Sequence, residues 1–578
     1  MTAVEKKHIR VRLILIGIVF TMLFGAIGTK AAYLQIFRTS WLSRKAADQY
    51  TLDLVRHGRR GTIYDANHIE MAISIDTTSI AAYPRMIPNP VQTAAVLAKA
   101  LNLNHGAVKR KLASKRSFVW IKRQVTPRER KAVSALKITG IDFIPAYGRF
   151  YPNRGLAASV LGFSGTEGRG LEGLEYRYEN YLKGPTHKVT VLKDALGRGF
   201  DAEKESRVSN GGDNLVLTID RNIQYIAENA LQEAVARFSA RSGMAIVMVP
   251  RSGAILALAQ CPRFNPNAFA GYDKGLWRNR AITDPFEPGS TMKIFSAAAA
   301  IESRTCTSNT IFFCENGSFR IGKHTVHDTH AHDWLSLQQI VKYSSNIGAV
   351  KVGRSIGPEV LYKTLRDFGF GRKTGIDCPG ETAGSLSSWK QWSGIDAGAI
   401  AFGQGLAVSA VQLATAVSAI ANDGILMKPY IVQAVTDQNG RLVKNISPRE
   451  VRRVVSPETA RTVRRILQTV TTSGGTGVQA ALDGYTVCGK TGTAQKVDRT
   501  GAYSKRKYVA SFVGFAPARA PELTILVIVD EPEKQHYGGI VAAPVFKKIA
   551  EESLNYLNIP FQKPETPLRA AQTGEMRG

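Results

Sequence analysis

The hydrophobic and polar positions of the chain first form a clear pattern near the N-terminus. Residues 13–29 are seventeen consecutive uncharged, mostly apolar positions, and the residues up to 37 can extend the same helix. A helix needs about 20 such residues to cross the hydrocarbon core of a bilayer. We therefore predict a transmembrane anchor at 13–37, preceded by a cytoplasmic tail at 1–12.

A cleavable signal peptide is the main alternative for this segment, but no small-x-small cleavage site follows the apolar run, which favours an uncleaved anchor. Basic residues flank the run on both sides: Lys6, Lys7, Arg10, Arg12, Arg38, Arg44 and Lys45. Because these charges nearly balance, the orientation of the anchor has to be inferred from the chemistry of the rest of the chain.

Beyond the anchor, residues 45–215 mix short strands with polar turns, and the turn-forming residues 210–213 are a plausible end for this stretch. We predict a separate domain here. At the other end, residues 561–578 are rich in Pro, Gln, Thr and Arg, a composition that cannot bury enough apolar surface to fold. That tail is predicted to be disordered.

The stretch 216–560 has the pattern of a larger domain. It begins with a strand, a helix starting near Ile223 and a strongly apolar strand at 243–249. Three more strands are predicted late in the chain, at 485–494, 509–516 and 523–529. Helices packed on an antiparallel sheet would accommodate this order, so the predicted fold class is α+β.

Composition changes this picture little. The 578 residues carry a net charge of +30, which raises the question of nucleic-acid binding. The charge is spread along the chain, with no basic run and no interleaved aromatic residues, so we predict no nucleic-acid partner. An anionic surface such as that of membrane lipid is the more natural partner.

Candidate chemistry first appears at Ser290, in a Ser-x-x-Lys pattern that places Lys293 almost one helical turn later. Pro288 and Gly289 interrupt the chain just before it, which predicts that Ser290 lies at a helix N-terminus. A partly desolvated lysine can take the proton of a serine hydroxyl, because burial and neighbouring cations lower its pKa. The pattern alone is common in long chains.

Two further motifs follow in order: Ser344-Ser345-Asn346 and Lys490-Thr491-Gly492-Thr493. The set Ser-x-x-Lys, Ser-x-Asn and Lys-Thr-Gly is the signature of penicillin-binding proteins and class A β-lactamases. The chain resembles the class B, monofunctional penicillin-binding proteins, and most closely the cell-division transpeptidases of the FtsI (PBP3-like) type. Other segments that match this family are 60–65, 149–152, 170–173, 217–220, 402–405 and 537–546.

The resemblance implies the penicillin-binding transpeptidase fold with an elongated pedestal at 45–215 and a catalytic domain at 216–560. It implies that Ser290 is the nucleophile and Lys293 its base. Ser344 would relay a proton, and the Asn346 amide would orient Lys293 and the substrate. Lys490, Thr491 and Thr493 would bind the substrate carboxylate and backbone. Gly492 would let a peptide lie close to the strand.

The same resemblance implies a peptidoglycan D,D-transpeptidase of the inner membrane, with its catalytic domain in the periplasm and its work at the division septum. Stem peptides are the expected substrates, β-lactams the expected covalent inhibitors, and an FtsW-like glycan polymerase and other division proteins the expected partners. No metal or organic cofactor is expected. An elongation-specific enzyme, a D,D-carboxypeptidase, a β-lactamase, a β-lactam sensor and a non-catalytic division scaffold are the alternatives.

Two patterns suggest other chemistry. Residues 484–491 match the P-loop formula G-x-x-x-x-G-K-[ST], but Tyr485 to Cys488 read as a strand and no helix follows Lys490. Four histidines, His324, His327, His330 and His332, with Asp328 and Asp333 among them, have a spacing that can hold zinc. We interpret them as a surface hairpin that needs no metal.

The five cysteines match no metal-binding spacing. Cys306 and Cys314 could pair in an oxidising compartment. Cys488 is interpreted as a small buried apolar side chain.

Overall fold

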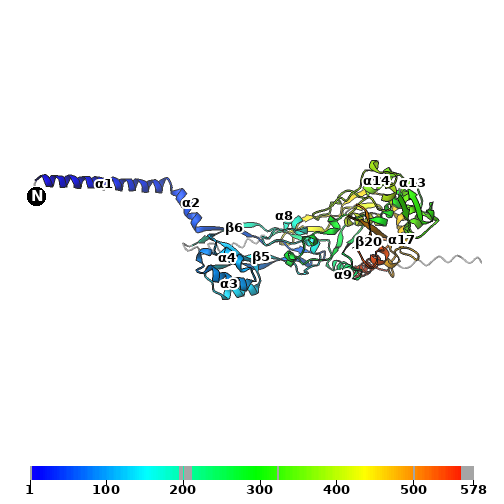
Figure 1. Ribbon diagram of the computed structural model, residues 1–578, viewed down its shortest axis with the longest axis horizontal. Helices are drawn as coiled ribbons and strands as arrows, with labels where there is room; N and C mark the ends of the chain where they lie inside the picture. The colour runs from blue at the N-terminus through cyan, green and yellow to red at the C-terminus, as the bar shows by residue number, and fades with distance from the viewer. Residues whose placement is uncertain (1–2, 194–198, 201–210, 322–323, 499–500, 562–578) are drawn as a thin grey trace, which may run out of the picture. The chain divides into compact units, whose positions relative to one another are not determined.

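The computed structural model describes residues 3–193, 199–200, 211–321, 324–498 and 501–561, and the chain forms two compact units. The first contains residues 1–58, 76–147 and 185–209, and the second contains 59–75, 148–184 and 210–578. Figure 1 labels their elements along the chain. The predicted tail, except for residue 561, and the predicted boundary residue 210 lie outside the described residues.

The first unit begins with a helix, α1, from Ala3 to Ile36, which contains the predicted anchor. It is the one helix among the described residues that is long and apolar enough to cross a membrane, judged by length and composition. None of its apolar window is buried in the protein. The structure therefore agrees with an N-terminal apolar helix and extends it about three turns before residue 13.

The rest of the first unit combines a three-stranded antiparallel sheet, β1-β6-β7, with three helices packed beside β4 around a small apolar core. Its elements are α2 Thr39–Tyr50, β1 Thr51–His57, α3 Pro90–Leu101, α4 His105–Leu112, β4 Val119–Val125, α5 Pro127–Ala135, β6 Thr186–Lys193 and β7 Gly199–Phe200. Two long strands, β3 Glu70–Ala82 and β5 Ile141–Phe150, pass from one unit into the other.

The part of the second unit that precedes residue 215 is organised by a buried carboxylate. Glu175 is fully buried and accepts hydrogen bonds from Arg60 at 2.5 Å and from Arg149 at 2.6 Å. A buried charge is tolerated only with such partners, so these three residues fix three separated segments together. The local elements are β2 Ile63–Tyr64, α6 Ala158–Leu161, α7 Gly173–Arg177 and α8 Glu179–Leu182.

A five-stranded antiparallel sheet of order β10-β9-β21-β20-β19 forms the centre of the second unit. Its strands are β9 Ser242–Met248, β10 Ile255–Cys261, β19 Cys488–Val497, β20 Tyr503–Ala516 and β21 Leu523–Asp530. Within this sheet, β19 pairs on one side alone, with β20, and so forms an edge. The predicted late strands are present, but β19 is shifted by three residues and β20 begins six residues earlier than predicted.

Both faces of the sheet are buried, and its strands alternate between two cores. On β9, Met244 and Ile246 belong to one core, whereas Ala245 and Val247 belong to the other. This explains the continuous apolar run at 243–249, since successive side chains point to opposite faces. Helices α9 Arg221–Arg237 and α19 Ala543–Tyr556 cover one face, and α11 Lys293–Glu302 and α16 Ala410–Ala421 contribute to the core on the other.

The remaining helices surround these layers, and Figure 1 labels α13, α14 and α17 among them. They are α10 Arg280–Thr283, α12 Leu337–Tyr343, α13 Asn346–Ile356, α14 Pro358–Asp367, α15 Asp396–Ala401, α17 Pro457–Val470 and α18 Gly538–Val541. Smaller strand pairs are β11 Ile311–Phe313 with β14 Trp334–Ser336, β12 Ser318–Ile321 with β13 His324–His327, β15 Ile425–Met427 with β18 Glu450–Arg453, and β16 Val432–Thr436 with β8 Asn214–Leu217 and β17 Leu442–Asn445. The predicted α+β architecture is confirmed.

Candidate active site

Ser290 lies in a single 3₁₀ turn, Gly289–Met292, that leads directly into α11. The α-helix therefore begins at Lys293, and Ser290 lies in the 3₁₀ turn that immediately precedes it. Gly289 has φ +54 and donates its N–H to the Gly403 carbonyl at 3.1 Å, which bends the chain into the turn. The turn brings Lys293 Nζ to 3.0 Å from Ser290 Oγ.

The second motif lies at a break between two helices. Ser344 ends α12 in the left-handed region with φ 64, and the Ser345 side chain caps α13 by accepting the Gly348 N–H at 2.9 Å. This sharp turn directs the motif toward Lys293, whose Nζ lies 2.6 Å from the Ser344 carbonyl and 2.8 Å from Asn346 Oδ1.

Hydrogen-bond counting indicates how Lys293 can act. The Ser344 carbonyl and Asn346 Oδ1 can only accept, so they match the two N–H groups of a neutral amine. The remaining lone pair can then accept the proton of Ser290, 3.0 Å away. The side chain is 1 % exposed, and burial lowers the pKa of Lys293 to about 7, partly opposed by the charge of Asp328. A neutral amine is thus accessible near neutral pH.

The third motif lies on the edge strand β19. Lys490 is fully buried, and its Nζ lies 2.9 Å from Ser344 Oγ, which is itself 3.2 Å from Lys293 Nζ. One hydroxyl therefore bridges two amines. Burial, together with the charge of Lys293, holds the pKa of Lys490 well below its ordinary value. A carboxylate arriving beside Lys490 would favour its charged form.

Gly492 lies where the turn that contains Ser290 packs directly against β19. A Cβ at this position would lie 2.3 Å from Ser511 Oγ, 3.0 Å from Thr291 Cγ2 and 3.3 Å from the Pro288 carbonyl. Glycine is therefore required here for packing within the protein. That it also lets a peptide lie close to the strand stays a prediction.

The two threonines of the third motif are held in place by neighbouring segments. Thr491 Oγ1 lies 2.9 Å from Thr476 Oγ1, and Thr493 Oγ1 accepts the Gly538 N–H at 3.1 Å. All eight predicted site residues consequently lie on three elements that meet: the Ser290 turn, the α12–α13 break and β19.

Asp328 is a site residue that the sequence reasoning noted only as a possible metal ligand. Its carboxylate accepts the Ser345 hydroxyl and the Asn346 N–H, both at 2.5 Å, and the Ile347 N–H at 3.1 Å. The carbonyl of His327, beside it, accepts from Asn346 Nδ2 at 3.0 Å. The histidine-rich hairpin thus positions the second motif through one carboxylate and one carbonyl.

Glu287, three residues before Ser290, was also missed. Its Oε1 accepts the Gly405 N–H at 2.9 Å and the Tyr503 hydroxyl at 3.2 Å, which links the Ser290 turn to the 403–405 turn and to the start of β20. Its Oε2 is buried with no hydrogen-bond partner among the residues that the structure describes, and burial raises the pKa of Glu287.

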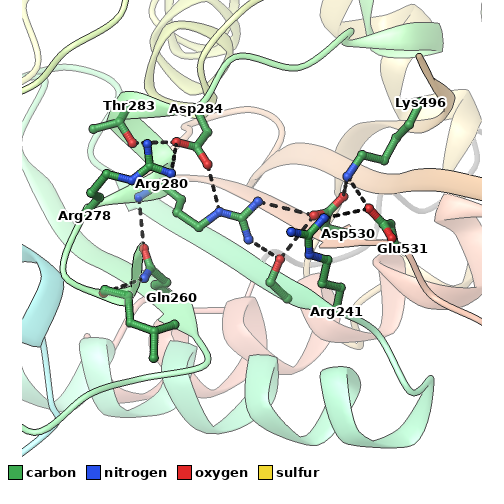
Figure 2. A network of polar contacts seen from close by, with 11 residues as sticks. Arg241, Gln260, Arg278, Arg280, Thr283, Asp284, Lys496, Asp530 and Glu531 are labelled. Atoms are coloured by element: carbon green, nitrogen blue, oxygen red, sulfur yellow. Dashed lines mark hydrogen bonds and ion pairs between the residues drawn. The ribbon is translucent and has the colours of Figure 1, made fainter. Parts of the chain in front are cut away.

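A charged network fixes the far end of β19 (Figure 2). Lys496, six residues after Lys490, contacts Asp530 at 2.8 Å and Glu531 at 2.7 Å, at the end of β21. Arg280 joins the same Asp530 at 3.3 Å. Partial burial works against the charge of Glu531, but its bonds from Lys496, Arg241 and Lys507 lower its pKa to about 2. The edge strand is therefore secured to its sheet beyond the site.

The alternative chemistries have clear outcomes. After Lys490 the chain continues as strand to Val497, so the P-loop reading is excluded by the missing helix. The histidines occupy the predicted exposed hairpin around β12 and β13, and no group of three metal-ligating side chains occurs among the described residues. All five cysteines are unpaired and buried.

Fold and site together define the chain as a serine acyltransferase of the penicillin-binding class. The model of the penicillin binding protein transpeptidase domain matches residues 243–551, and that of the penicillin-binding protein dimerisation domain matches 56–217. The chain belongs to this family and is a peptidoglycan D,D-transpeptidase.

Individual relatives match over nearly the full length. The chain is 32 % identical to the peptidoglycan D,D-transpeptidase FtsI of Escherichia coli K12, over 93 % of this chain and 92 % of the relative. It is 34 % identical to stage V sporulation protein D of Bacillus subtilis, over 97 % and 88 %. Penicillin binding protein 3 of Mycobacterium tuberculosis, solved with aztreonam, has a TM-score of 0.68 at 29 % identity, covering 88 % and 99 %.

The first prediction concerns the pH dependence of acylation. Only neutral Lys293 can accept a proton, so the acylation rate of full-length protein should rise about tenfold per pH unit below a midpoint near 7 and level off above it. Asp328 raises the pKa of Lys293, so Asp328→Asn should move the midpoint to lower pH. Asp333→Asn, an exposed acidic residue on the same loop, is the matched control and should not move it.

Stopped-flow acylation by a chromogenic cephalosporin between pH 5 and 9 gives the profile. A midpoint that stays in place or rises in Asp328→Asn would contradict the assignment of Lys293 as the titrating base.

The histidine hairpin yields a second prediction. His327 contacts the second motif through its carbonyl, and the side chains of His327 and His330 are exposed. Replacing both with alanine should therefore leave the acylation rate within about threefold. Loss of activity on adding a chelator, with recovery on adding zinc, would instead revive the metal interpretation.

Proposed function

We propose that this protein crosslinks peptidoglycan at the division septum through an acyl ester on Ser290. The observation that carries the proposal is the position of Lys293 Nζ, which lies within 3.2 Å of oxygens from Ser290, Ser344 and Asn346. A buried amine that meets the serine and the second motif at once is positioned to transfer protons between them.

In the first half-reaction, Ser290 Oγ attacks the carbonyl carbon of the penultimate D-Ala of a donor stem peptide. Lys293 accepts the hydroxyl proton as the O–C bond forms. The C–N bond then breaks, and the terminal D-Ala leaves with a proton delivered through the Ser344 hydroxyl, which lies 3.2 Å from Lys293. The backbone N–H groups of Ser290 and Thr493 are proposed to stabilise the oxyanion.

In the second half-reaction, the amine of a neighbouring stem peptide attacks the ester carbonyl. Its proton passes back through the same lysine, and Ser290 is released as a hydroxyl. The donor peptide is proposed to lie along the unpaired edge of β19, as an added strand. Lys490, Thr491 and Thr493 would then bind its carboxylate and backbone.

The proposed domain plan has a cytoplasmic tail at 1–12, an anchor at 13–37, a non-catalytic domain at 45–215, a catalytic domain at 216–560 and a tail at 561–578. The dimerisation-domain and transpeptidase-domain matches at 56–217 and 243–551 support the two central ranges. The non-catalytic and catalytic domains are both proposed to lie outside the cytoplasm. An FtsW-like polymerase and other division proteins would be their partners, and β-lactams would be covalent inhibitors of the catalytic domain. The complex of the mycobacterial relative with aztreonam supports the last point.

The third prediction tests the nucleophile. Full-length protein should gain one benzylpenicilloyl mass, which peptide mapping should place on Ser290. Ser290→Ala should remove the adduct, whereas Ser303→Ala, at the other end of α11, should retain it. Lys293→Ala should slow acylation by about 10²–10⁴, and Lys293→Arg should be as slow, since a guanidinium does not release its proton.

An adduct that persists in folded Ser290→Ala would refute this mechanism, and a wild-type protein that never acylates would favour the scaffold alternative. The lifetime of the adduct separates the remaining classes. A transpeptidase should hold it for many minutes, whereas rapid hydrolysis with turnover would indicate a β-lactamase.

The fourth prediction concerns topology and site of action. Reporter fusions after residues 60 and 560 should both give a periplasmic signal, because wall chemistry takes place outside the membrane. A fluorescent fusion of the full chain should gather at midcell during constriction. A cytoplasmic reporter signal at either position would overturn the proposed orientation, and uniform labelling of the side wall would favour an elongation role.

A further inference from the structure

Helix α17 has one face that the proposed mechanism does not use. Its buried face consists of Thr459, Ala460, Val463, Ile466, Leu467 and Val470. The opposite face, spaced by three or four residues, carries Glu458, Arg461, Thr462, Arg465 and Gln468. This second face lines a pocket of about 720 Å³ together with Arg464, Cys488, Ala518 and Arg519.

Four guanidinium groups therefore line one pocket, and the described lining residues include one carboxylate, that of Glu458. Arg464 is 12 % exposed and pairs with Asp423 at 2.7 Å. Arg461 pairs with Glu458 at 2.9 Å, but both side chains are more than half exposed, and such surface pairs contribute little. The lining thus has more positive than negative charge.

The side chain of Arg465 has a neutral hydrogen-bond partner, whereas Arg461 and Arg464 pair with carboxylates. It lies on the exposed face of α17 and donates to the Thr462 hydroxyl at 3.3 Å. A guanidinium with this environment keeps donors available for an incoming anion, and its planar fork suits the oxygens of a phosphate.

We propose that this pocket binds a phosphate or diphosphate group, free or carried on a larger ligand. Several guanidinium groups around one cavity match a multiply charged oxyanion better than a single carboxylate, which neutralises only one of them. The lining contains no aromatic side chain on which a base could stack, which argues against a nucleotide base as the part recognised.

The pocket is adjacent to the catalytic strand but distinct from the proposed chemistry. Cys488 begins β19, and its thiol donates to the Arg464 carbonyl at 3.2 Å. Thr471, just after α17, donates to the Val487 carbonyl at 2.8 Å. These bonds join α17 to the start of the strand that bears Lys490, whereas Lys293 and Ser344 contact Ser290, Lys490 and each other. The inference goes beyond the proposed function and does not depend on it.

Isothermal titration of detergent-solubilised full-length protein tests the inference, with pyrophosphate, glycerol 3-phosphate and citrate as probes at constant ionic strength. Pyrophosphate should bind with a Kd of about 1 mM or tighter. Arg461→Gln/Arg465→Gln should weaken it at least about tenfold, since two charged donors are lost. The matched control is Arg441→Gln/Arg449→Gln, which removes the same charge from exposed positions near β17 and β18.

Acylation by benzylpenicillin serves as the fold check, and both double variants should retain the wild-type rate. Tight binding of glycerol 3-phosphate as well would indicate a phosphomonoester or lipid headgroup source, and binding of pyrophosphate alone a diphosphate source. Absent binding, equal binding of citrate, or the same loss in both double variants would overturn the proposal. A protein that binds pyrophosphate but never acylates would refute the proposed function and leave this inference intact.

Discussion

The active site depends on keeping the amine of Lys293 buried while its N–H groups retain hydrogen-bond acceptors. Moving a lysine out of water disfavours its charge, and a neutral amine in a protein interior still needs partners for its two N–H groups. The Ser344 carbonyl and the Asn346 side chain supply them, at 2.6 and 2.8 Å from Lys293 Nζ. The left-handed backbone at Ser344 and the Asp328 carboxylate both serve this need. The first turns the Ser344 carbonyl toward the amine, and the second accepts the backbone N–H of Asn346 and so holds that residue in place.

The same constraint explains why the site requires close backbone packing. The turn that bears Ser290 can approach the strand that bears Lys490 only if no side chain separates the two backbones. Gly289 and Gly492 both lie at that contact. A Cβ on Gly538 would likewise lie 2.3 Å from the carbonyls of Gly492 and Ser511. The glycines therefore set the depth at which the three motifs meet, while the ionic network around Asp530 holds the other end of β19 (Figure 2). An edge strand fixed at both ends can offer its free side to a peptide without losing register.

Much of this arrangement was predictable from sequence because it is encoded locally. The three motifs, the apolar run on β9 and the N-terminal helix are short patterns whose meaning does not depend on distant residues. Asp328, Glu287 and the packing role of Gly492 were not predictable in the same way. Asp328 is seventeen residues before its partner Ser345, and Glu287 meets a turn 118 residues later, so their roles exist only once the chain has folded. The histidines beside Asp328 also suggested a metal site, and so the pattern did not indicate its role in positioning Asn346. The only local signal for Glu287 was its place three residues before the serine.

The two lysines do not titrate independently, and this has a consequence for the order of events. Ser344 Oγ lies 2.9 Å from one Nζ and 3.2 Å from the other, so two charged amines there would repel each other in a poorly solvated space. The positive charge of Lys293 lowers the pKa of Lys490, so the protonation of the two amines is coupled. A substrate carboxylate beside Lys490 favours charge on Lys490, and charge on Lys490 favours neutral Lys293. If the substrate carboxylate binds at Lys490 as proposed, it would therefore assist the base at the point where Ser290 must lose its proton.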